Sequence, residues 1–262
     1  MTDHDHSHAP GGSADSAGQP WAGRSFSDNP HSDDAGEADP VLLASLGAFH
    51  EGRASQADVV DALRRARLLI PLLAELGDEG LTDAGKRVDK SQELSIVTVA
   101  GPDGRTVLPV FSSVTAMGQW NASARPVPAD GIRVALAAAS EQTDVVVLDA
   151  TSPTQFVVRR PALWAMAQQL PWVPAAESAE VADAFAESVA AKPVVVGVDL
   201  EAGDPGAVLA GPELIVRLTL VPGLTGPDLE ALLRRLANRW AESELIAAQV
   251  DSLEVALRAA AD

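Results

Sequence analysis

The chain has 262 residues, of which 47% are hydrophobic, and its 37 acidic and 19 basic residues give a formal net charge of −18 at pH 7. Such a chain can bury a sizeable core, but its charge repels phosphate backbones and anionic lipid surfaces, so we expect no nucleic-acid partner and no membrane partner. The absence of cysteine excludes disulfides, thiolate catalysis, iron–sulfur clusters and cysteine-based zinc sites.

The first 39 residues are rich in Gly, Ser, Asp, His and Pro and poor in aliphatic residues. Such a segment cannot bury enough apolar surface to offset the entropy of ordering, so we predict a disordered tail over residues 1–39. It has no basic region followed by an apolar run, as a secretory signal would have. Together with the missing cysteines, this leads us to expect a cytoplasmic protein.

Two motifs in this tail could bind something. "HDHSH" can bind nickel, copper or zinc weakly and without selectivity, but a plain polar tail explains it as well, and we predict no metal or cofactor. "WAGRSFSDNP" places Trp21, Arg24 and Phe26 in a segment otherwise poor in aromatics. These three residues form either a short docking segment, for a partner or for the chain's own domain, or a chance feature of the composition.

The first ordered elements are predicted to be two helices with recognisable N-termini. Asp39 is a suitable N-cap residue and Pro40 suits a first helical turn, so a helix is expected from residue 40. Ser55 and Asp58 have the spacing of a capping box at the start of a second helix. Behind them, Val59 and later apolar residues recur at helical spacing.

Strands are expected next. Residues 67–76, "RLLIPLLAEL", form a predicted strand in which Pro71 cannot donate to a ladder, so we expect an edge strand or a bulge. A polar loop follows over residues 77–92. Residues 93–101, "ELSIVTVAG", are interpreted as one strand, with residues 106–110, "TVLPV", as its hairpin partner.

The two serines after this hairpin can be nucleophiles or helix caps. Ser112 or Ser113 stands where an N-cap is needed, directly before "VTAMGQW". A nucleophilic serine needs a nearby base, but His50 is the one histidine outside the predicted tail, and no G-x-S-x-G motif is present. We therefore predict a capping role and no catalytic residue.

The rest of the chain alternates between strand and helix patterns. A helix is expected at residues 133–142, strands at 143–150 and 154–160, and a helix from Pro161. The prolines of "PWVPAAE" suggest a domain boundary near residue 175. Beyond it we expect elements at these ranges: a helix at 178–191, strands at 193–200 and 213–221, an amphipathic helix at 225–240, and a strand at 251–259, where a helix is the alternative.

These elements predict an α/β (α+β) fold: a mixed sheet with flanking helices, followed by a smaller β-β-α-β unit. The domains are expected at residues 40–175 and 176–262, after the tail.

Several segments, taken in order, resemble the N-terminal domain of SseB-type proteins, the enhanced serine sensitivity family: "LLIPLLAE", "DKSQELSIVTVAGPDGRTVLPVFSSVTAMGQW", "ARPVP", "RVALAAA", "DVVVLDATSP" and "RRPALWAMAQ". The resemblance spans about residues 55–175, and the chain's end resembles the family's C-terminal half more weakly. It implies an α/β fold and no particular catalytic residue.

Three groups of residues remain as candidates for function. The first consists of acids after a predicted strand, namely Asp199, Glu201 and Asp204, which can hold Mg²⁺ or belong to a solvated loop. The second consists of arginines that would grip an anion if they converged, namely Arg105, Arg125, Arg133, Arg159 and Arg160. The third consists of tryptophans that can form core or line a partner-binding surface, namely Trp120, Trp164 and Trp172.

The sequence favours a non-catalytic protein-interaction or regulatory module that binds a protein partner or a second copy of itself. The possible partner-binding residues are those already named in the tail, together with the three tryptophans of the first domain. The alternative is a small-molecule sensor, for an amino acid or another anion, or an enzyme linked to serine metabolism. No phosphate-binding glycine motif supports nucleotide binding.

Overall fold

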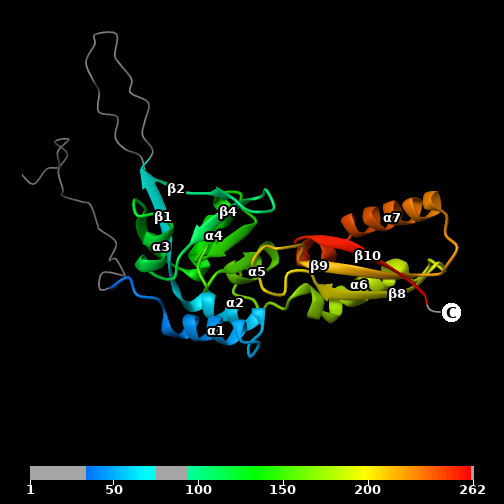
Figure 1. The fold of residues 1–262 in the computed structure, drawn as a ribbon, viewed down its shortest axis with the longest axis horizontal. Helices are drawn as coiled ribbons and strands as arrows, with labels where there is room; N and C mark the ends of the chain where they lie inside the picture. The colour runs from blue at the N-terminus through cyan, green and yellow to red at the C-terminus, as the bar shows by residue number, and fades with distance from the viewer. Residues whose placement is uncertain (1–33, 75–93, 261–262) are drawn as a thin grey trace, which may run out of the picture. The chain divides into compact units, whose positions relative to one another are not determined.

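The computed structural model describes residues 34–74 and 94–260. Residues 36–262 form one compact unit, and all the helices and strands named below lie in it. Residues 1–33 of the predicted tail and the predicted loop at 77–92 lie outside the described residues. Helices pack against small mixed and antiparallel sheets, which confirms the expected α+β fold class (Figure 1). No helix in the described ranges is long and apolar enough to cross a membrane.

The two N-terminal helices start where their caps predict. In α1 (Pro40–His50), the Asp39 carboxylate accepts backbone N–H groups of the first turn. In α2 (Gln56–Arg65), the Ser55 hydroxyl accepts the Asp58 N–H at 3.2 Å, and the Asp58 carboxylate accepts the Ser55 N–H at 2.8 Å. Both predicted starts, including the capping box, are confirmed.

The first sheet is antiparallel, with the order β2-β1-β5. Its strands are β1 (Arg67–Ala74), β2 (Leu94–Ile96) and β5 (Arg125–Asp130). Since β1 lies in the middle and its pairing with β5 is regular, the expectation that Pro71 marks an edge strand or a bulge is wrong.

The backbone around Pro71 explains why the central strand tolerates it. Alternate residues of a strand point their N–H groups to opposite sides. Leu69 exchanges two backbone hydrogen bonds with Phe111, at 2.8 and 2.9 Å, so the N–H that Pro71 lacks would lie on that same side. There it falls before β2 pairing begins at Leu72. Toward β5, Pro71 lies opposite Pro126, and neither residue is required to donate.

The second sheet is mixed and has the order β3-β4-β6-β7, in which β4 and β6 are parallel. Its strands are β3 (Val99–Ala100), β4 (Thr106–Val110), β6 (Val145–Leu148) and β7 (Phe156–Arg159). The predicted hairpin is confirmed, because β3 pairs with β4. The single strand predicted at 93–101 is wrong, since the chain changes sheets there: β2 pairs with β1 and β3 with β4.

Three helices complete this part of the fold: α3 (Val114–Trp120), α4 (Gly131–Ser140) and α5 (Arg160–Ala167). Helices α4 and α5 pack against each other and against α2. The core they share with the strands includes these fully buried side chains: Leu42, Leu46, Leu63, Leu68, Leu108, Leu148, Phe156 and Met166.

The C-terminal part has one sheet, of order β10-β9-β8, in which β9 and β10 are parallel. After the short 3₁₀ turn η1 (Ala175–Glu177), its elements are α6 (Ala179–Val189), β8 (Val195–Ala202), β9 (Leu214–Leu220), α7 (Gly226–Ala241), α8 (Glu244–Gln249) and β10 (Leu253–Ala259). The predicted β-β-α-β order is confirmed, and the terminal segment is a strand. Helix α8 was not predicted.

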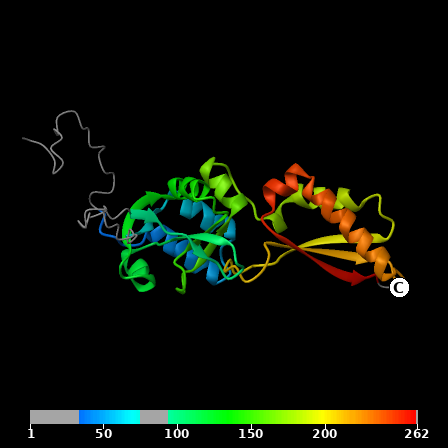
Figure 2. The same ribbon diagram turned by 90° about the horizontal axis from the view of Figure 1, so that it is seen from above.

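Helices α6 and α7 cover one face of this sheet (Figure 2). The alternating apolar residues of β9, from Leu214 to Leu220, are buried beneath them, as their period of two predicts. Trp240 of α7 packs edge-on against Phe185 of α6 and donates its indole N–H to the Ser188 hydroxyl at 2.8 Å. This core is separate from the first one, and the domain boundary near residue 175 stays a prediction.

Candidate functional site

The structure separates the predicted partner-binding tryptophans. Trp21, Arg24 and Phe26 lie outside the described residues. Trp120, at the end of α3, packs against Phe111 with ring centroids 5.2 Å apart and belongs to a small apolar cluster of its own. Trp164 and Trp172, in contrast, line the same hollow.

We call this hollow the aromatic groove. It has a volume of about 520 Å³, and α5, the segment after it, the start of α6 and the end of α8 form its walls. Its lining residues include Pro161, Trp164, Gln168, Leu170, Trp172, Val173, Glu177, Glu180 and Gln249. Trp164 is 44% exposed, and Leu170 and Val173 are each 52% exposed, so three large apolar side chains of the lining are open to solvent.

The chain after α5 is shaped by a tight turn and two prolines. Gln169 has a positive φ of 58°, and the Leu170 N–H returns to the Ala165 carbonyl at 2.9 Å, which ends the helix. The Arg64 guanidinium holds the Leu170 carbonyl at 2.6 Å. Trp172 then packs one side against the first core while lining the groove. It is partly buried and not a free linker residue.

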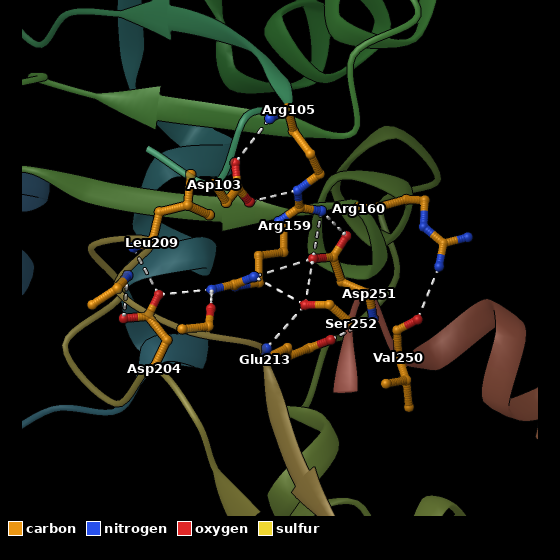
Figure 3. A network of polar contacts seen from close by, with 12 residues as sticks. Asp103, Arg105, Arg159, Arg160, Asp204, Leu209, Glu213, Val250, Asp251 and Ser252 are labelled. Carbon is orange, nitrogen blue, oxygen red and sulfur yellow. Dashed lines mark hydrogen bonds and ion pairs between the residues drawn. The ribbon is translucent and has the colours of Figure 1, made fainter. Parts of the chain in front are cut away.

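Trp164 is positioned by its neighbour on the same helix. The Arg160 guanidinium lies over the indole ring, 4.9 Å from its centroid, which is a cation–π distance. Arg160 also donates to the Val250 carbonyl at 2.9 Å, directly after α8 (Figure 3). One arginine therefore orients the exposed ring and joins two walls of the groove.

Beside Arg160 lies a largely buried set of charged and polar residues, which we call the Arg159 network: Arg105, Arg159, Asp204, Glu213, Asp251 and Ser252 (Figure 3). Arg159, at the end of β7, has a side chain only 8% exposed. It pairs with Asp204 at 2.8 Å and Asp251 at 3.1 Å. Arg105 reaches the same Asp251 at 2.9 Å. Both buried carboxylates are thus neutralised by arginine.

Asp204 also organises the loop that follows β8. Its carboxylate accepts the backbone N–H groups of Leu209 at 2.8 Å and Val208 at 3.2 Å. The loop is bound to the first part of the fold as well, because the Val157 N–H donates to the Ala207 carbonyl at 2.7 Å. The network and this loop therefore tie the elements before residue 175 to those after it.

This arrangement settles where the predicted arginines and acids lie. Arg105, Arg159 and Arg160 do converge, but on acids and carbonyls of the chain itself. Arg125 and Arg133 lie away from them, on β5 and α4. Among the acids, Asp204 is buried in the network, while Glu201 pairs with Arg217 and Asp199 with Arg258. In the described ranges no group of three or more His, Asp or Glu residues is placed to hold a metal ion.

Glu213 is a carboxyl group of the network whose pKa is strongly raised. Its carboxylate accepts the Asp251 backbone N–H at 2.5 Å. Burial, followed by the neighbouring charge of Asp251, raises the pKa of Glu213 to about 7, although the hydrogen bond and the two nearby arginines act in the opposite direction. The site thus contains a carboxyl group that changes charge near neutral pH.

Replacing Glu213 with glutamine should make the protein more stable at pH 8. The folded pKa is raised from 4.5 to about 7, so the folded state keeps a proton that the unfolded state loses, and stability falls as pH rises through this window. Because Glu213 is partly exposed, we expect a gain of about 1–2 kcal/mol at pH 8 that vanishes near pH 4.5. Denaturant unfolding across this range measures it.

Glu201→Gln is the control, and it should change the stability at pH 8 in the opposite direction. The hydrogen bond from Arg217 lowers the pKa of Glu201, so its charged form contributes stability above the ordinary pKa and loses it as the pH falls. Glutamine at position 201 should therefore slightly destabilise the protein at pH 8. A pH-independent difference between Glu213→Gln and the wild type would contradict the assignment of Glu213.

The serine pair divides its work between two structural roles. Ser113 is the N-cap of α3 and accepts the Ala116 N–H at 3.1 Å, which confirms the predicted cap. Ser112 is buried and donates both its N–H and its hydroxyl to Asp149, each at 2.7 Å. Thr154 donates to the same carboxylate at 2.9 Å. These hydrogen bonds join the ends of β4 and β6, and the sequence did not reveal the partner of Ser112.

One comparison with known proteins gives a match. Residues 42–165 match the family model described as the SseB protein N-terminal domain. This range runs from α1 into α5, and it includes Trp164 but ends before Trp172. No curated protein and no solved structure matches the chain.

Proposed function

We propose that this chain, whose residues 42–165 match the SseB protein N-terminal domain, is a non-catalytic protein-interaction module that binds a partner in the aromatic groove. The observation that carries the proposal is the exposed Trp164 ring, held by Arg160 in a groove with further exposed apolar residues. Exposed aromatic surface beside apolar walls is typical of partner-binding sites. We further propose a cytoplasmic location, which the cysteine-free sequence supports.

The groove indicates the chemistry of its partner. Its apolar walls suit a large apolar side chain, while Glu177 and Glu180 lie on its lining from the start of α6. The chain as a whole carries a net charge of −18, which attracts basic partners. The proposed occupant is therefore an extended protein segment with an aromatic or aliphatic residue flanked by Lys or Arg.

The alternative, a small-molecule sensor or an enzyme linked to serine metabolism, has less support. It requires arginines and acids that open onto a pocket. Arg159 is instead saturated by Asp204, Asp251 and the Gly211 carbonyl, and its side chain is 8% exposed. A ligand anion would have to displace buried carboxylates from the arginine, and the desolvation and lost ion pairing would cost roughly several kcal/mol.

Trp164→Glu should abolish partner binding while leaving the fold intact. The substitution removes the exposed ring and places a charged group, which is costly to desolvate, where the apolar side chain of the partner would pack. Loss of one central aromatic typically weakens binding by about 30-fold or more. The measurement is quantitative co-purification with the full chain, followed by crosslinking of the captured partner and mapping of the crosslinked segment. That segment should contain an apolar residue with basic neighbours.

Leu136→Glu provides the matched control, because Leu136 is 53% exposed on α4 and does not line the groove. It should bind like the wild type. A partner that Trp164→Glu retains would overturn the groove as the docking site. If the partner is lost only when residues 1–39 are removed, the segment around Trp21 and Phe26 is the docking element instead. A thermal shift with amino acids or nucleotides would favour the sensor alternative.

A further inference from the structure

Strand β10 forms an open edge of the C-terminal sheet, and its sequence is self-complementary. It pairs with β9 over its whole length, from Leu253 to Ala259, and no segment of the described ranges pairs with its outer side. Open edges of this kind present unpaired backbone groups that can bind a further strand. The backbone groups that point outward determine which strand can pair with this edge.

The backbone hydrogen bonds fix that direction. The Leu214 N–H donates to the Ser252 carbonyl at 3.1 Å, and the Ala260 N–H donates to the Leu220 carbonyl at 2.8 Å. In a parallel pair, alternate residues make the ladder bonds, so the even-numbered residues of β10 face β9. The N–H and C=O groups of Leu253, Val255, Leu257 and Ala259 therefore point away from the sheet.

The side chains alternate in the same way. Leu253 and Val255 pack toward the helices, and Leu257 lies on that same face by its period but is 43% exposed. Glu254 and Arg258 project from the opposite, open face. Arg258 there donates to the Thr219 hydroxyl of β9 at 3.0 and 3.3 Å and makes an exposed ion pair with Asp199 of β8 at 3.3 Å. The exposed ion pair is worth little. No cation of the described residues pairs with Glu254.

We propose that the chain forms a homodimer in which β10 pairs with β10 of a second copy in antiparallel fashion, with the two-fold axis at Ala256. In this register Glu254 lies opposite Arg258 of the second copy, and Val255 lies opposite its Leu257. Each odd-numbered residue then meets another odd-numbered residue, so the outward N–H and C=O groups are the ones that pair. Both charge pairs fall on the open face and the apolar pairs fall on the helix face.

Other registers lose this complementarity. A shift by two residues places Glu254 and Arg258 opposite uncharged residues, and a parallel arrangement places like charges side by side, which is unfavourable. The dimer also covers the exposed Leu257. The dimer places the Leu257 side chain beside Val255 of the second copy. Val255 lines an apolar hollow of about 440 Å³ between β10, α7 and α8. The charge pattern, the outward backbone groups and the uncovered leucine therefore point to the same partner strand.

Sedimentation velocity of the full chain over a concentration series tests the proposal. The wild type should shift with concentration toward a mass twice 27.1 kDa. Glu254→Arg places two cations opposite each other at both ends of the interface and should raise the dimer dissociation constant about 30-fold. The double variant Glu254→Arg with Arg258→Glu restores opposite charges and should restore the dimer.

Glu230→Arg is the matched control, because it makes the same charge change at an exposed position of α7 and should leave the dimer unchanged. A wild type that stays monomeric up to about 200 µM, or a dimer that Glu254→Arg does not weaken, would overturn the proposal. Trp164→Glu should still dimerise, so the dimer and the aromatic groove can fail independently.

Discussion

Replacing Arg159 with methionine should lower the free energy of unfolding by about 3–5 kcal/mol, because it leaves the buried Asp204 carboxylate without its cation and removes one of the two arginines that pair with Asp251. Asp204 and Asp251 have side chains only 2% and 1% exposed, so water cannot take the place of the guanidinium. The Gly211 carbonyl also loses its donor. Chemical denaturation at neutral pH measures the loss.

Arg217→Met is the control for this experiment. Arg217 makes an equally close pair with Glu201, at 2.7 Å, but the two side chains are 30% and 46% exposed. Exposed pairs contribute about 0.2–1 kcal/mol, so this variant should be nearly as stable as the wild type. Similar losses for the two variants would contradict the view that burial decides the effect.

A second comparison separates the charge from the packing. If the stranded Asp204 carboxylate causes the loss, neutralising it in the double variant Arg159→Met, Asp204→Asn should recover part of the stability. If the loss comes from the missing volume of arginine, the double variant should be no more stable than Arg159→Met. Leu209 and Val208 donate their N–H groups to different oxygens of Asp204, and asparagine keeps one acceptor oxygen, so the recovery should be partial.

The features that the sequence predicted well are those decided by neighbouring residues. The Ser55–Asp58 capping box and the Ser113 cap depend on residues three apart. The face of β9 depends on its own alternation. Local spacing fixes such features wherever the element packs, so the α+β class and much of the element order followed from the sequence, but β5, α8 and the division between β2 and β3 did not.

The features it missed depend on where distant segments meet. Arg159 and Asp251 are 92 residues apart, and Arg105 and Asp251 are 146 apart, so no spacing rule relates them. The sequence suggests that the arginines could converge, but it presents Asp204 as a possible loop acid and does not mark Asp251 as a partner. Similarly, Pro71 is compatible with a central strand only because Phe111 and Pro126 happen to lie beside it.

The candidate site combines both kinds of feature. The sequence identified Trp164 and Trp172 as possible partner-binding residues, and the structure places them on one groove. Trp120, the third tryptophan that the sequence suggested for this role, packs elsewhere. What the sequence lacked was the role of Arg160, which holds the Trp164 ring and the end of α8 at once.

The closest backbone approach in the first core gives the other large effect: Gly131→Ala should destabilise the protein by about 3 kcal/mol or more. A Cβ at Gly131 would lie 2.1 Å from the Leu63 carbonyl oxygen and 2.9 Å from the Arg64 Cα. These are backbone atoms of α2, so no side chain can rotate away. The Gly131 N–H also donates to the Ala66 carbonyl at 3.2 Å, which holds α4 against the end of α2.

Gly47→Ala makes the same chemical change with the opposite expected sign. Gly47 lies on the exposed side of α1, and a Cβ there meets nothing within 4 Å, so alanine should stabilise the helix by up to about 1 kcal/mol. Thermal and denaturant unfolding of both variants measure the contrast. Should Gly131→Ala prove neutral, α2 and α4 would have to separate by about an ångström without opening the core that Leu63 and Val134 share, and the close packing of that core argues against such a movement.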